Sequence, residues 1–187
     1  LTKTGTPTMG GIFLIPIGLL IGNIININKE GSIIVFTLSL LTIFFMFIGL
    51  IDDFLSLKRK TNTGLSPTEK IILQVLISFL FIIISIFNGW ITEAILISNK
   101  MINLQYLIIP LSLFVLLAES NSTNLTDGLD GLLSGCSILI FTGLAIHLVQ
   151  DNQNIHTTIA RLCIAMAGAC IGFLFLNKNP AKIFMGD

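Results

Sequence analysis

Six apolar stretches follow one another along this chain and constrain its fold more than any other feature. They cover residues 10–27, 33–51, 71–87, 101–118, 132–149 and 159–176. Each approaches the ~20 residues that a helix needs to cross a bilayer. A water-soluble domain could bury one such stretch, but six would leave almost no polar surface to face water. The sequence therefore predicts an all-α, polytopic membrane helix bundle, with residues 1–187 in one domain.

Charged residues are scarce, and their charges balance. They make up 11% of the chain, whereas about a quarter is usual in soluble domains. The formal net charge is zero, so no basic field exists to recruit nucleic acid. Cys136, Cys163 and Cys170 lie in apolar stretches without a CxxC pair, which is typical of small buried hydrophobic residues. Any charge with a function must therefore act locally.

The basic residues of the short connections predict the orientation, because Lys and Arg concentrate on the cytoplasmic side of membrane proteins. Counting the spans assigns one group to a single face: Lys3, Lys58, Arg59, Lys60, Lys70, Lys178 and Lys182. The connections of the opposite face hold only Lys29 and Lys100, and Arg161 begins the last span. The first face is therefore expected to be cytoplasmic.

Four polar motifs lie on that same face. They are IDDF at 51–54, KRKTNTGLSPTEK at 58–70, NLTDGLDG at 124–131 and NKNPAKIFMGD at 177–187. The opposite connections hold mostly scattered polar residues of the kind that cap helices. The sequence therefore predicts chemistry at one face and turns at the other.

Asp52 and Asp53 close the second predicted span. The helix macrodipole presents partial negative charge at that end, so two adjacent carboxylates there need a cation. In one interpretation the helix simply continues into water, and Lys58, Arg59 and Lys60 neutralise the pair. In the other, the pair binds Mg²⁺, which commonly uses one or two protein carboxylates and leaves its other positions to water and phosphates.

Two glycine-containing motifs also allow two interpretations. In NLTDGLDG, Asp130 could cap the next helix and the glycines could permit a turn. The spacing of Asp127 and Asp130 would alternatively place both carboxylates on one side of a helical turn, where Gly128 would let a ligand approach the backbone. In GTPTMGG, residues 5–11, the helix start could receive phosphate, or its small residues could serve helix packing.

The ordered set TPTMGG, GLIDDF, NTGLSPTEK, NLTDGLDG and NPAKIFMGD resembles the polyprenyl-phosphate N-acetylhexosamine-1-phosphate transferase family. Within that family it is most similar to the branch whose donor is UDP-N-acetylmuramoyl-pentapeptide. The resemblance spans essentially the whole chain and implies a bundle of ten spans. We therefore expect a piece of a longer protein at both ends, without the first helix and without a His-rich cytoplasmic loop after FMGD.

The resemblance also implies roles for individual residues. It makes Asp52, Asp53 and Asp187 catalytic and assigns the same three to Mg²⁺. Asn177 and Phe184 match positions that contact the nucleoside, with Phe184 stacking on uracil. The substrate-binding set that it implies is Lys3, Thr8, Lys70, Asn121, Asn124, Asp127, Gly128, Asp130, Asn177 and Phe184. The chain departs from the family in having Ser56 where many members have Lys, so Lys58 or Lys60 could take that role.

The reaction implied is transfer of a phospho-sugar from the UDP-linked donor to undecaprenyl phosphate with release of UMP. Its product is the first lipid-linked precursor of peptidoglycan in the bacterial inner membrane. We expect direct attack by the lipid phosphate, and no turnover by residues 1–187 alone. A sister transferase that uses UDP-N-acetylglucosamine is the alternative, and an ion-coupled transporter a distant one, because its acidic residues would lie deep inside the spans. The sequence leaves open whether the protein is a homodimer.

Overall fold

A computed structural model describes residues 6–59, 64–91, 94–97, 100–151 and 153–187. Six helices follow in chain order, interrupted after the third by a hairpin of two antiparallel strands, β1 and β2. The elements are α1 (Gly11–Ile25), α2 (Ser32–Arg59), α3 (Pro67–Phe87), β1 (Ala94–Ile97), β2 (Lys100–Asn103), a 3-10 turn (Gln105–Leu107), α4 (Ile108–Thr126), α5 (Leu132–Gln150) and α6 (Asn154–Asn177).

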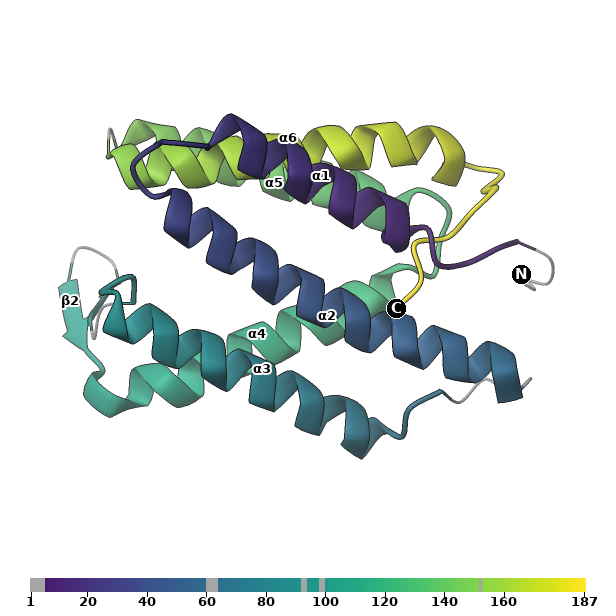
Figure 1. Ribbon diagram of the computed structural model, residues 1–187, viewed down its shortest axis with the longest axis horizontal. Coiled ribbons are helices and arrows are strands. Elements are labelled where there is room, and N and C mark those ends of the chain that lie inside the picture. Colours follow the sequence, from purple (N-terminus) through teal and green to yellow (C-terminus); the bar gives the residue numbers. More distant parts are fainter. Residues whose placement is uncertain (1–5, 60–63, 92–93, 98–99, 152) are drawn as a thin grey trace.

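The helices form two layers that are joined by α2. Figure 1 shows α1, α5 and α6 together in one layer and α3 with α4 in the other, while α2 crosses between them. The contacts agree with this view, since α6 packs on α1 and α5, α3 packs on α4, and α2 contacts α1, α3 and α6. The ends of both layers that carry the polar motifs therefore meet beside α2.

Close packing of α1 on α6 depends on small residues. Gly18 and Gly22 lie one turn apart, and a Cβ at Gly18 would come within 2.6 Å of the Met166 sulfur. Glycines at this spacing let two membrane helices approach closely. The buried residues Cys163 and Cys170 belong to the apolar core, and Cys136 is half-buried. The interpretation of the cysteines as buried hydrophobic residues is confirmed for Cys163 and Cys170.

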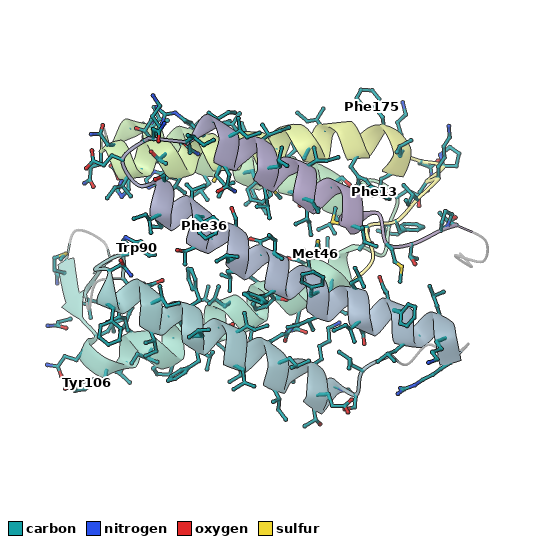
Figure 2. All side chains as sticks on the ribbon, viewed as in Figure 1. Phe13, Phe36, Met46, Trp90, Tyr106 and Phe175 are labelled. Atoms are coloured by element: carbon teal, nitrogen blue, oxygen red, sulfur yellow. The ribbon has the colours of Figure 1, made fainter. Side chains whose placement is uncertain are left out.

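The outer surface is apolar, as expected of a bundle in lipid. Phe175 and Tyr106 point away from the helices at opposite edges of Figure 2, and both are exposed. In α3 the usual amphipathic pattern is inverted: Gln74, Ser78 and Ser85 are buried, whereas the outer face carries residues such as Leu76 and Leu80. Polar side chains of membrane helices turn inward in this way. Within the described residues, five helices are long and apolar enough to cross a membrane.

The predicted spans differ from the helices at several boundaries. The first helix has 15 residues and is shorter than a standard span. The fourth predicted span was wrong at its start, because residues 100–103 form strand β2 and the helix begins at Ile108. Helix α2 continues past residue 51 to Arg59. Apolar residues mark the part of a helix that contacts lipid. The helix itself continues until its backbone hydrogen bonding is interrupted.

Candidate active site

The C-terminal segment, residues 178–187, follows α6 and lies against the start of α1. Phe184 N–H donates to the Pro7 carbonyl, Gly10 N–H donates to the Phe184 carbonyl, and Gly11 N–H donates to the Met185 carbonyl, each at 2.9 Å. Figure 1 shows the C-terminal segment passing beside the start of α1 on its way to α2. These amides are therefore already bonded, which favours the structural interpretation of GTPTMGG over phosphate binding. Thr8 is exposed beside this pairing, and Lys3 lies outside the described residues.

A single ammonium joins two carboxylates from different parts of the chain. Lys70 Nζ lies 3.3 Å from Asp52 Oδ2 and 2.6 Å from Asp187 Oδ2. The Asp187 backbone N–H donates to Asp53 Oδ2 at 3.1 Å. The structure thus brings together the three predicted catalytic aspartates, from α2 and the C-terminal segment, around one lysine of α3.

The start of α3 explains why Lys70 points at this cluster. Ser66 caps the helix: its hydroxyl accepts from Glu69 N–H at 3.3 Å, and the Glu69 carboxylate accepts from Ser66 N–H at 2.8 Å. Pro67 follows at the first helical position, where its lost N–H costs nothing. This reciprocal cap begins α3 immediately before Lys70 and so places its side chain in the first turn.

The two aspartates of the pair have different environments. Asp52 Oδ1 accepts from Leu65 N–H at 2.6 Å, and its other oxygen contacts Lys70. Asp53 instead lines a cavity. Both lie inside α2 rather than at its end, so the macrodipole argument for a cation at this position was wrong. Among the described residues, Lys70 pairs with Asp52, whereas the guanidinium of Arg59 donates to the Gly64 carbonyl at 2.7 Å.

The two carboxylates of NLTDGLDG hold the C-terminal segment in place. Asp127 is buried and accepts from Gly186 N–H at 2.9 Å. Asp130 accepts from the Asn179 amide and from Ala181 N–H, both at 3.0 Å. The prediction that they share one side of a helical turn was wrong, because α4 ends at Thr126 and residues 127–131 form the connection to α5. Gly128 is exposed in this connection.

Two predicted nucleoside contacts lie in the packed interior. Asn177 is fully buried; its Oδ1 accepts from Gly131 N–H and the Ser134 hydroxyl, and its amide donates to the Ile183 carbonyl. Phe184 is 4% exposed. Both side chains serve packing in this arrangement, and their contact with a nucleoside stays a prediction.

A cavity of about 310 Å³ opens beside the carboxylates, between α1, α2 and α4. At its polar end lie Asp53, Asn124 and Asp187, whereas residues such as Leu41 and Phe45 line its apolar part. Asn121 follows the lining residue Ser120 but donates to Gln74 Oε1 at 3.0 Å. The cavity thus combines an anionic end with an apolar wall.

Electrostatics keep Asp187 ionised. Burial opposes its charge, but hydrogen bonds with Asp52, Lys70 and Asn124, together with the Lys70 charge, outweigh that effect and lower the pKa of Asp187. Within the described residues no three His, Cys, Asp or Glu side chains form a metal-binding group. Asp53 and Asp187 nevertheless give two adjacent carboxylates at the cavity, a donor set that fits Mg²⁺ completed by water and phosphate oxygens.

Two glycines essential to this geometry were not singled out from the sequence. A Cβ at Gly49 would collide with the Asp187 carbonyl, so only glycine lets the C-terminal segment approach α2 so closely. Gly186 has φ +81°, and a Cβ there would collide with Asp53 Oδ2. A glycine beside the last aspartate of FMGD was the available signal for a left-handed residue.

Comparison with known proteins gives a consistent result. The profile described as glycosyl transferase family 4 matches residues 35–187. A protein of Prochlorococcus marinus (strain NATL2A) named phospho-N-acetylmuramoyl-pentapeptide-transferase is 66% identical over 185 residues, which are 99% of this chain and 50% of that protein. A protein of the same name from Synechococcus sp. (strain CC9605) is 48% identical over 187 residues, which are 100% of this chain and 53% of that protein. The chain spans about half the length of the curated relatives it matches.

Proposed function

This chain belongs to glycosyl transferase family 4, and we propose that the protein containing it transfers phospho-N-acetylmuramoyl-pentapeptide from its UDP-linked donor to undecaprenyl phosphate. The products would be UMP and the first lipid-linked precursor of peptidoglycan. The observation that carries the proposal is the Lys70–aspartate cluster beside a cavity with an apolar wall. Such a site suits a reaction between two phosphates, one of which has a hydrocarbon tail.

The chain's own residues supply binding and proton transfer. Lys70 is held between two carboxylates, where its ammonium can also contact a phosphate of the donor. Asp53 faces the cavity and is placed to accept the proton of the lipid phosphate. An oxygen of that phosphate then bonds to the sugar-bearing phosphorus, and the bond from this phosphorus to UMP breaks. We favour this direct attack over attack by an aspartate.

We propose that Asp187 and one carboxylate oxygen of Asp53 hold Mg²⁺, which leaves the second oxygen of Asp53 to accept the proton, with Asp52 nearby. Bound there, the ion would neutralise the phosphates that the two substrates bring together. Both carboxylates lie at the polar end of the cavity and are joined through the Asp187 N–H.

We also propose a location for the protein and an orientation for its site. The apolar helices and the family together identify a multi-pass membrane protein. We propose the bacterial inner membrane with the Lys70 cluster at the cytoplasmic surface, on the basis of the basic residues that share its face. Because about half of the relatives' length is outside this chain, we also propose that residues 1–187 alone do not catalyse the transfer.

The test is UMP release by the full-length protein in a lipid bilayer with undecaprenyl phosphate. UDP-N-acetylmuramoyl-pentapeptide and UDP-N-acetylglucosamine are offered separately, each with Mg²⁺ and again with excess EDTA. The proposal predicts turnover with the first donor and its loss in EDTA. Turnover with UDP-N-acetylglucosamine alone would assign the sister activity, and equal turnover in EDTA would refute the role of Mg²⁺.

A further inference from the structure

Gln74 is the largest buried polar side chain described in α3. Its side chain is 2% exposed and bridges to α4. The amide Nε2 donates to the Ser120 hydroxyl at 3.2 Å, and Oε1 accepts from the Asn121 amide at 3.0 Å. An amide inside a membrane bundle is costly unless it is bonded in this way, and such residues commonly mark functional sites.

The position of Gln74 connects this bridge to the candidate active site. It lies four residues after Lys70, so the two side chains project from the same face of α3, one turn apart. On α4, Ser120 lines the cavity, and Asn124 lies one turn further on at its polar end. The bridge thus joins the helix that carries Lys70 to the helix that carries the cavity wall.

Apart from Lys70 in its first turn, α3 is placed mainly by apolar packing. It packs on α2 and α4 but belongs to the layer that excludes α1, α5 and α6. Ser78 and Ser85, further along the same buried face, have no hydrogen-bond partner for their hydroxyls among the described residues. Beyond the first turn of α3, Gln74 is therefore the side chain that sets its register against α4 through directed bonds.

Resting on the proposed function, we propose that Gln74 is a positioning residue that holds Lys70 at the distance from which it reaches both Asp52 and Asp187. A helix advances 1.5 Å per residue. A slide of α3 by one residue would therefore move the Lys70 backbone by about 1.5 Å relative to Asp187 and disturb their 2.6 Å contact. Gln74 acts through Lys70 and does not touch the reacting groups.

The experiment compares Gln74→Met with wild type in the full-length protein, since Met keeps the size of the side chain but forms neither bond. Ser78→Ala is the matched control one turn further along the same face. UMP release gives kcat and the donor KM, and thermal denaturation in detergent reports folding. We expect Gln74→Met to lower kcat about 10- to 100-fold, the scale for a displaced catalytic group, with little change in KM. Ser78→Ala should match wild type.

A double-mutant cycle separates positioning from simple packing. In a Lys70→Arg background, which keeps the charge but not the ammonium geometry, Gln74→Met should cause little further loss of kcat, because coupled residues are not additive. An equal loss in both backgrounds, or an unchanged kcat in Gln74→Met, would overturn the proposal. If Gln74→Met does not fold, Ser120→Ala removes one bond alone and must show the same non-additivity. Absence of UMP release by wild type with every donor would instead refute the proposed function.

Discussion

Gly186→Ala should disrupt the candidate active site without removing any polar group. Gly186 has φ +81°, its N–H donates to Asp127 at 2.9 Å, and the next N–H donates to Asp53 at 3.1 Å. A Cβ at this position would collide with the same Asp53 oxygen and would come within 2.9 Å of the Met9 nitrogen. The substituted segment must therefore move away from α2.

The magnitude follows from two costs. A left-handed conformation costs an L-residue about 1–2 kcal/mol. Moving the segment also loses the hydrogen bond between Asp187 N–H and the Asp53 carboxylate, and a bond to a charged group contributes about 1.5–3 kcal/mol. Together these costs disfavour the assembled site by about 2.5–5 kcal/mol. Since about 1.4 kcal/mol corresponds to a factor of ten, activity should fall by about two orders of magnitude or more.

The assay is UMP release by the full-length protein, with thermal denaturation to report folding. Gly135→Ala is the control, because a Cβ at this helical glycine of α5 would meet nothing within 4 Å. We expect Gly135→Ala to keep wild-type turnover and Gly186→Ala to lose it while the helices remain folded. The expected loss is about two orders of magnitude. If Gly186→Ala instead keeps turnover within about threefold of wild type, the placement of the C-terminal segment against Asp53 is refuted.

Two further predictions concern the same segment. Phe184→Ala should lower the free energy of unfolding by about 3–5 kcal/mol, because its ring is buried, and an unchanged thermal denaturation would contradict that burial; donor affinity measured by calorimetry on the folded fraction tests the predicted stacking on uracil separately. Because the pKa of Asp187 is lowered from 3.8 in the folded protein, its contribution to stability is present above pH 3.8 and is lost as the pH falls through the lowered value. The difference in thermal stability between wild type and Asp187→Asn should therefore shrink only below pH 3.8. A difference that shrinks between pH 7 and 5 would contradict the direction of the pKa shift.

The sequence predicts the class of fold and the face of the site well. Apolar stretches locate the helices, because the bilayer demands about twenty apolar residues for each span. Counting the spans then places the polar motifs on one face, and the contacts of Lys70 with Asp52 and Asp187 confirm that three of them meet. Helix ends are predicted less well, since α2 extends past the apolar stretch to Arg59, through a segment in which Leu, Lys and Arg favour helix although its charges mark the end of the span.

The pairings within the site could not be predicted in the same way. Asp127 and Asp130 bond to backbone groups about fifty to sixty residues further along the chain, and no local pattern specifies such partners. The backbone N–H groups of Gly10 and Gly11 likewise donate to carbonyls of the C-terminal segment. Gln74 carried a signal that was readable from the sequence, because a lone amide in an apolar span calls for a buried partner.

The most direct test of the account is the rate of UMP release by Asp53→Asn in the full-length protein. Asp151→Asn is the matched control, because Asp151 pairs with His156 at the other end of α5, away from the cavity. With UDP-N-acetylmuramoyl-pentapeptide, undecaprenyl phosphate and Mg²⁺, the account predicts wild-type turnover in Asp151→Asn. It predicts a loss of at least about 10²-fold in Asp53→Asn, the scale for removing a general base, with both variants folded. Near-normal turnover in Asp53→Asn would contradict the assignment of this carboxylate cluster as the catalytic centre.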